Sequence, residues 1–204
     1  MLKRIYTNIL IISIILSLLI FNGCMKMTEE INQSEKSEET IKKENNTKAI
    51  ALISKAHVYL EAGQKDEALK ILSQATDEAE KIESYAAYYG AAKAHALTGI
   101  AVSYVKAGQD SKALEIIEKI DGDYAECDKA VALYSISNTY IESKQIDKAL
   151  DTLNKALEIV EKEGKCFMGG DVSLLEQIAI SYSKVGKEDK TLEILSKDIK
   201  EEEK

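Results

Sequence analysis

The residues best suited to acid–base or metal chemistry are few in this chain of 204 residues. Neither His57 nor His95 stands in an H-E-x-x-H motif or at another metal-ligand spacing. No G-x-S-x-G turn is present to hold a serine nucleophile. The glycines between 164 and 170 follow a predicted helix and lack the Lys-Ser/Thr pair of a phosphate loop. We therefore expect no enzyme, no metal and no cofactor, and we interpret both histidines as surface or packing residues.

Two cysteines could form a covalent link. Cys127 lies near the start of a helix predicted over 125–143, and Cys166 lies just past the end of the next one, over 146–163. These helices are antiparallel about a turn near Lys144, so both cysteines return to one end of the hairpin. Cysteines pair outside the cytoplasm, and a loop of this size would stabilise the fold by about 3–4 kcal/mol. The spacing leaves both a disulfide and two free thiols open.

The N-terminal segment resembles a targeting signal. Lys3 and Arg4 precede an apolar run from Ile9 to Phe21. At ~1.5 Å per residue this run spans roughly 20 Å, less than the ~30 Å hydrocarbon core of a bilayer. A secretory signal peptide over 1–23 is therefore favoured, with an uncleaved signal anchor as the alternative.

The end of this segment carries a third cysteine. Gly23 followed by Cys24 resembles the lipobox of bacterial lipoproteins, in which the signal is cut before a lipidated cysteine. The resemblance implies that Cys24 is lipidated and that the chain is held at the extracytoplasmic face of the cell membrane, since two acyl chains give stable anchoring. The alternative is a chance cysteine after a signal peptide, which still places the remainder outside the cytoplasm.

Composition separates a tether from a folded region. Residues 24–47 are polar and nearly free of apolar periodicity, which predicts a flexible tether. The whole chain has no proline or tryptophan, 30% charged residues and a net charge of −8. This composition favours helices over a sheet. The acidic balance offers no footprint for nucleic acid, whose phosphates it would repel.

A repeated pattern dominates the chain from residue 48 onward. Four segments align on a tyrosine, with leucine seven residues before it, a small residue or serine three before it, and a small-leucine pair nine and ten after it, except for threonine-leucine in the last copy. Glycine stands four residues after three of the tyrosines, and Lys144 after the other. The anchoring residues are Tyr59, Tyr104, Tyr140 and Tyr182.

The spacing of this pattern predicts helical hairpins. Apolar residues three and four apart form one stripe of a first helix, and glycine supplies the positive φ that ends it. A second helix then carries a stripe of its own, as in Ala68, Leu69 and Leu72. One hairpin cannot bury both stripes alone, so neighbouring hairpins must stack.

This pattern resembles the tetratricopeptide repeat (TPR) family over about residues 49–200. The resemblance implies an all-α fold, an α-solenoid of about four antiparallel hairpins in a domain over 48–204. The tyrosines are 45, 36 and 42 residues apart where the family repeats every 34, and the family's proline is missing. We expect helices near 48–62, 65–83, 85–107, 110–120, 125–143, 146–163, 171–185 and 188–201.

The resemblance also implies a groove lined by the first helices, which in this family holds a peptide or a helix of a partner. Lysines and arginines of the family's carboxylate clamp are missing at these positions, and only Asn138 fits that set. We expect a lipid-anchored scaffold that binds a protein or peptide of unknown identity at the cell envelope. The alternatives are a small-molecule sensor using the groove and a self-associating structural protein. The predicted groove residues are Ile53, His57, Thr98, Val102, Tyr134, Asn138, Glu176 and Ile180.

Overall fold

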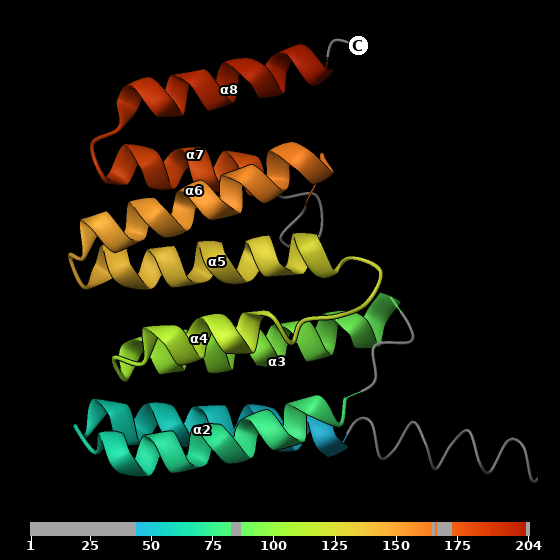
Figure 1. The fold of residues 1–204 in the computed structure, drawn as a ribbon, viewed down its shortest axis with the longest axis vertical. Coiled ribbons are helices and arrows are strands. Elements are labelled where there is room, and N and C mark those ends of the chain that lie inside the picture. The colour runs from blue at the N-terminus through green and yellow to red at the C-terminus, as the bar shows by residue number, and fades with distance from the viewer. Residues whose placement is uncertain (1–43, 83–86, 165, 167–172, 203–204) are drawn as a thin grey trace, which may run out of the picture. The chain divides into compact units, whose positions relative to one another are not determined.

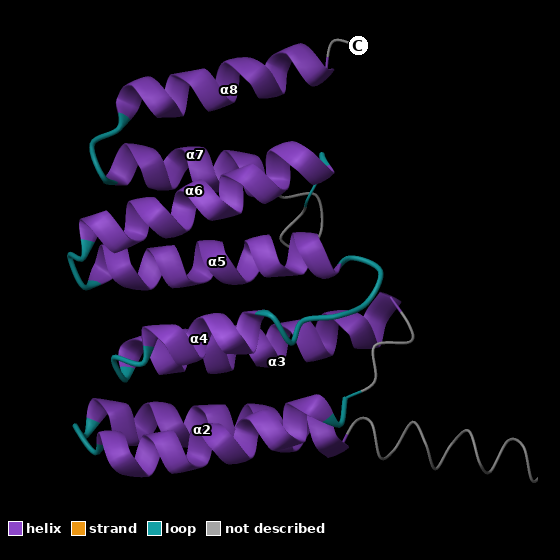
Figure 2. Ribbon diagram, viewed as in Figure 1, coloured by secondary structure: helices purple, strands orange, loops and turns teal. Residues whose placement is uncertain are grey.

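The computed structural model describes residues 44–82, 87–164, 166 and 173–202. Every regular element in these ranges is a helix (Figure 2). A first helix covers 44–61. It is followed by α2 (Lys65–Glu80), α3 (Ala87–Lys106), α4 (Asp110–Ile117), α5 (Ala125–Glu142), α6 (Ile146–Glu163), α7 (Leu174–Lys184) and α8 (Glu188–Glu202). The expected signal segment, Cys24 and residues 24–43 of the expected tether lie outside the described residues.

The first helix begins at residue 44, four residues before the expected start at residue 48. The early part of this helix packs on the end of α2. Ala49 is fully buried, and Lys48 Nζ lies 2.8 Å from Glu78 Oε1. These contacts stabilise a helical turn that has no apolar periodicity of its own.

The helices pair into four hairpins, which follow one another in chain order (Figure 1). Hairpin one contains residues 44–61 and α2, and hairpin two contains α3 and α4. Hairpin three contains α5 and α6, and hairpin four contains α7 and α8. Contacts join α3 to α5 and α5 to α7, so the first helices of successive hairpins from two to four pack directly on each other.

Each hairpin turn has the same hydrogen bonding. The tyrosine carbonyl accepts from the backbone N–H five residues later, at 2.8 Å for Tyr59, Tyr104 and Tyr140 and 3.0 Å for Tyr182. The residue four after each tyrosine has a positive φ, which is 73°, 83° and 73° at the three glycines and 59° at Lys144. This is the Schellman arrangement that satisfies the last carbonyls of a helix. The tyrosine-to-glycine spacing therefore predicted the turns of hairpins one, two and four correctly, and the alignment of the repeats placed the turn of hairpin three at Lys144.

The predicted stripes form the core. The small residue three before each tyrosine is fully buried in all four hairpins, as are the alanines nine after it in the first three. The leucines seven before the tyrosine are buried in hairpins two and three and half-buried in hairpins one and four. The stripe is thus less completely covered at the two ends of the described array.

Two second helices end earlier than expected. The helix expected to reach 83 ends at Glu80, and the helix expected to reach 120 ends at Ile117. Beyond each end, the backbone hydrogen bonds join residues three apart, as in Ile82 N–H to Ala79 O and Ile120 N–H to Ile117 O. These tight turns bury Ile82 and Ile120, so burial of one side chain ends each helix.

Candidate binding groove

The eight predicted groove residues occupy two positions on each first helix, six and two residues before the tyrosine. We call them the forward positions, because Ile53, His57, Tyr134 and Asn138 contact the following hairpin. The positions five and one before the tyrosine are the rear positions, and their contacts with the preceding hairpin come from Gly99, Ser103, Gln177 and Ser181. The forward residues are Ile53, His57, Thr98, Val102, Tyr134, Asn138, Glu176 and Ile180, and the rear residues are Ser54, Val58, Gly99, Ser103, Ser135, Thr139, Gln177 and Ser181.

His57 connects the first two hairpins. Its Nε2 lies 2.7 Å from Ser103 Oγ, and the Ser103 hydroxyl donates to Gly99 O at 2.7 Å. Because that hydroxyl proton is already used, we assign the proton between the two side chains to His57 Nε2, which donates to Ser103 Oγ. Burial and the nearby charge of Lys106 lower the pKa of His57, against a smaller opposing effect of Glu61. His57 therefore acts as a neutral hydrogen-bond donor between hairpins.

The same register joins hairpins three and four. The Ser181 hydroxyl donates to Asn138 Oδ1 at 3.2 Å, and the Tyr134 hydroxyl lies 3.5 Å from Gln177 Oε1. Tyr134 is largely buried, which leaves little of it available to a partner. Asn138, which alone fits the carboxylate-clamp set, is therefore already engaged by the neighbouring hairpin.

Small rear residues allow close packing at these junctions. A Cβ added at Gly99 would lie 3.5 Å from Ile53 Cδ1, so the forward isoleucine packs directly over the glycine. Four of the eight predicted groove residues thus contact the next hairpin as well as lying along the first helices. The exposure of the others differs: Thr98 and Val102 are half-buried, whereas Glu176 and Ile180 are exposed.

The repeat tyrosines also join successive hairpins, through partners that the sequence pattern did not reveal. The hydroxyl of Tyr182 donates to Asn154 Oδ1 on α6 at 2.5 Å. The side chain of Tyr104 lies near Thr76 on α2, and that of Tyr140 lies near Asp110 at the start of α4. Burial raises the pKa of Tyr182 to about 12, with the carboxylates of Glu161 and Glu193 adding to the effect. The three partners differ in type and in offset, so no repeated signal marked them.

A cleft of about 240 Å³ separates hairpins two and three on the side of the second helices. Two of its four charged side chains are paired with each other, since Lys148 Nζ lies 2.6 Å from Asp110 Oδ2 and 5.4 Å from the centre of the Tyr140 ring. Its volume is slightly below the ~300–1,000 Å³ of typical small-molecule sites. The lining residues are Val105, Asp110, Ala113, Leu114, Ile136, Tyr140, Lys148, Asp151, Thr152 and Lys155.

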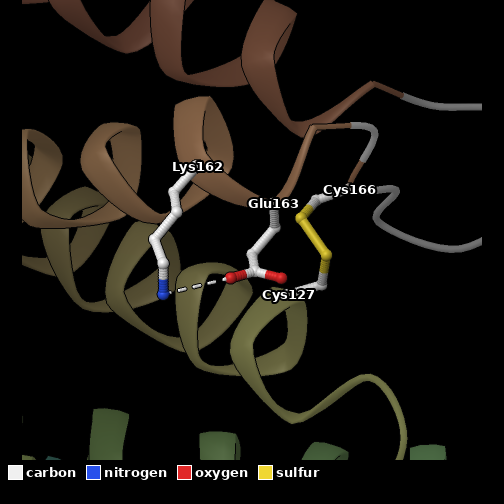
Figure 3. The surroundings of a disulfide bond; sticks show 4 residues. All are labelled: Cys127, Lys162, Glu163 and Cys166. Atoms are coloured by element: carbon white, nitrogen blue, oxygen red, sulfur yellow. Dashed lines mark ion pairs between the residues drawn. A yellow bond between two sulfur atoms is a disulfide. The ribbon is translucent and has the colours of Figure 1, made fainter.

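A disulfide closes the open end of hairpin three. Cys127 at the start of α5 and Cys166 beyond α6 are joined with an S–S distance of 2.00 Å and a Cα–Cα distance of 5.3 Å. Figure 3 shows the bond beside Glu163, whose carboxylate pairs with Lys162 at 3.4 Å. Of the two states that the sequence left open, the structure has the bonded one. The bond fixes the loop after α6 to the first turn of α5.

The described ranges contain neither a metal-binding cluster nor a membrane-spanning helix. There, no group of three or more histidine, cysteine or acidic side chains is placed to hold a metal ion. None of the described helices combines the length and the apolar character needed to cross a bilayer. His95 is exposed on α3.

Comparison with a family model identifies repeats in two of the hairpins. Residues 49–82 and 130–162 match the family model described as tetratricopeptide repeat, and these segments coincide with hairpins one and three. A crystal structure of nearly identical TPR-like repeats from Podosopora anserina, in a chain named as a kinesin light chain, matches with a TM-score of 0.41 and 17% identity, covering 74% of each chain. A second crystal structure, of a single-substitution variant of that protein, gives the same score and identity, covering 74% of this chain and 73% of that one. No curated protein matches. The fold is an all-helical set of paired hairpins that resembles TPR-like repeats.

Proposed function

We propose that this chain is an extracytoplasmic, lipid-anchored repeat scaffold that binds a protein or peptide partner along its first helices. The observation that carries the proposal is the register of the forward positions, which lines up apolar and weakly polar side chains across consecutive hairpins. Proteins use such surfaces to hold an extended or helical segment. Thr98 and Val102, in the middle of the surface, are half-buried and leave part of their side chains open to a partner.

The chemistry of this surface favours a partner segment with apolar side chains. Glu176 is the only carboxylate among the eight forward residues, and none of them is lysine or arginine. Asn138 is already bonded to Ser181. A terminal carboxylate would therefore find no cation to pair with at these positions. We expect recognition through buried apolar contacts, which commonly carry most of the energy of such interfaces.

The proposed location rests on two independent features. The N-terminal segment ends in Gly23-Cys24 after a charged start and an apolar run, as a lipoprotein signal does. Separately, the Cys127–Cys166 disulfide is the kind of bond that persists in oxidising compartments and is rare in the cytosol. Both features favour a chain that leaves the cytoplasm.

Site-specific photo-cross-linking in intact membranes tests the binding proposal. A cross-linking amino acid at Val102 should capture a defined polypeptide, identified by mass spectrometry. The same group at the exposed Glu158 on α6 serves as the control and should not capture it. Capture of nothing but copies of the chain at Val102, or a metabolite retained by the protein with no polypeptide captured, would contradict peptide binding in favour of self-association or small-molecule sensing.

Lipid anchoring has its own test. Cys24→Ser should release the chain from the membrane fraction or leave it as an unprocessed precursor, and intact-mass measurement should show a diacylglyceryl group on the parent alone. A Cys24→Ser chain that still partitions fully with the membrane, with a parent of unmodified mass, would support the uncleaved signal anchor instead.

A further inference from the structure

The junctions between hairpins follow a register that leaves complementary positions unused at the two ends. The forward residue two before the tyrosine meets the rear residue one before the next tyrosine, as in His57 with Ser103 and Asn138 with Ser181. In the described chain, no hairpin precedes hairpin one or follows hairpin four. The rear positions of the first and the forward positions of the last therefore contact no other hairpin among the described residues.

The rear stripe of hairpin one consists of Ile50, Ser54 and Val58, spaced four residues apart on one helix face. Ile50 is 43% exposed and Val58 is 64% exposed. At the position of Val58, hairpins two and four have Ser103 and Ser181, which are both fully buried. This position is fully buried in hairpins two and four and half-buried, as Thr139, in hairpin three. In hairpin one it is open and carries an apolar residue where the others carry hydroxyls.

The forward face of hairpin four shows the matching feature. Ile180 occupies the position of His57 and Asn138 and is 45% exposed. Leu192, ten residues after Tyr182, is 66% exposed, whereas the equivalent Leu69 and Leu150 are half-buried and Leu114 is 42% exposed. Ile180 and Leu192 therefore both lie in contact with water, and Ile180 does so at the position that His57 and Asn138 use against the following hairpin.

The two end faces match each other in chemistry. The hydrogen-bonded internal junctions pair a polar forward side chain with a hydroxyl, while the ends offer Ile180 and Val58, which are both apolar. Glu176, the one forward carboxylate, would come near Lys55, which is exposed beside Ser54 on the opposite end.

We propose that the chain associates head to tail with a second copy of itself. The forward face of hairpin four (Glu176, Ile180 and Leu192) would pack on the rear stripe of hairpin one of the next copy and continue the internal register across the junction. Such a heterologous contact yields a ring if its rotation closes and an open chain of copies if it does not. The proposal uses the ends of the array and is independent of partner binding at Val102.

Disulfide trapping between copies of the full-length chain in membranes tests the contact. Val58→Cys and Ile180→Cys are made on two differently tagged copies and co-expressed, and mixed-tag dimers are measured after mild oxidation. We expect the 58–180 combination to give at least tenfold more mixed-tag dimer than Val58→Cys with Glu158→Cys, where Glu158 is exposed away from both ends. Adding Lys55→Glu to the Val58→Cys copy should lower the yield severalfold, because Glu176 would then face a like charge.

Several results would overturn the proposal. One is a 58–180 yield no higher than the Glu158 control, and another is a dimer of Val58→Cys or Ile180→Cys with itself at equal yield, which indicates a symmetric contact. A third is a cross-link from position 58 to a different protein or to the N-terminal part of its own chain. Thermal melts of the cysteine variants that match the parent establish that the fold is retained, as expected for two exposed sites. Cross-linking at Val102 is scored separately, so either proposal can fail alone.

Discussion

At the residue scale, the repeated spacing predicted the turns but not the bonds between hairpins. A tyrosine followed by a glycine four residues later was sufficient to predict a glycine turn, because the αL conformation and the carbonyl that it satisfies are local properties of the chain. The partner of His57 was not predictable in this way. Ser103 is 46 positions away, and its position depends on the register between two hairpins whose spacing along the chain is irregular.

Lys144 is a residue where the fold accepts a local cost. Its φ of 59° is the one positive value outside glycine among the described residues. A side chain in this region costs roughly 1–2 kcal/mol, part of which is offset by the greater freedom of glycine in the unfolded chain. We expect Lys144→Gly to raise the free energy of unfolding by about 0.5–1 kcal/mol, measured by urea denaturation.

Gly108→Ala provides the matched control for this prediction. Gly108 has a φ of 83°, and a Cβ added there would meet no atom within 4 Å, so its substitution tests conformation without a clash. We expect a loss of about 1 kcal/mol. Equal effects of both substitutions in the same direction would contradict the assignment of strain to Lys144.

His57 should make stability depend on pH. Its pKa in the fold is lowered from 6.5, so the unfolded chain takes up a proton first as the pH falls. The stabilisation from neutral His57 is then complete above about pH 6.5 and is lost progressively below it. His57→Gln retains an N–H donor for Ser103 but does not titrate, so its unfolding free energy should fall less between pH 7 and 5. Identical slopes for the parent and the variant would refute this role.

At the element scale, helix type and order were predictable, and helix ends were less so. The hydrophobic stripe sets where a helix must exist, and all eight expected helices are found in the described residues. Beyond the ends of α2 and α4, tight three-residue turns instead hold Ile82 and Ile120 in buried positions. The residue at which such a helix ends reflects contacts with other elements, and a local sequence pattern does not reveal those contacts.

The disulfide should contribute to the stability of hairpin three. Cys127 and Cys166 are 39 residues apart, and closing a loop of this size restricts the unfolded chain by about 4 kcal/mol in the chain-entropy model. We expect the double variant Cys127→Ser, Cys166→Ser to lose about 3–4 kcal/mol in chemical denaturation. A reductant should shift the transition of the parent and leave that of the variant unchanged. Two free thiols found by mass spectrometry on unreduced, air-equilibrated protein would contradict the bond.

At the scale of the whole molecule, the sequence predicted stacked hairpins but assigned the forward positions a single role. These residues were expected to line a groove, and four of them also hold the next hairpin in register. Both roles follow from one geometry, because a side chain between two parallel first helices faces the neighbouring helix and the shared surface at once. A repeat pattern identifies such positions. Whether a side chain there mainly lines the groove or mainly contacts the next hairpin depends on the residues of that next hairpin.

Stability should be distributed hairpin by hairpin, because each hairpin contacts its immediate neighbours. Ile194 on α8 is fully buried, so Ile194→Ala should cost roughly 2–4 kcal/mol locally. Hydrogen exchange should then accelerate in α7 and α8 while α2 keeps its protection. Leu192→Ala, on the same helix but 66% exposed, is the control and should change stability by less than about 0.5 kcal/mol at concentrations where the chain is monomeric. Equal acceleration in α2 would show that the array unfolds as one unit.

The disulfide of hairpin three has a further consequence for a scaffold that is held at one end and loaded at the other. Tension along the chain would pass through the sulfur atoms and bypass the 39-residue interval between them. At about 3.4 Å per extended residue, roughly 130 Å of contour length would be withheld from stretching. Hairpin three would then act as an inextensible link between more compliant hairpins, and it would yield its length only after reduction.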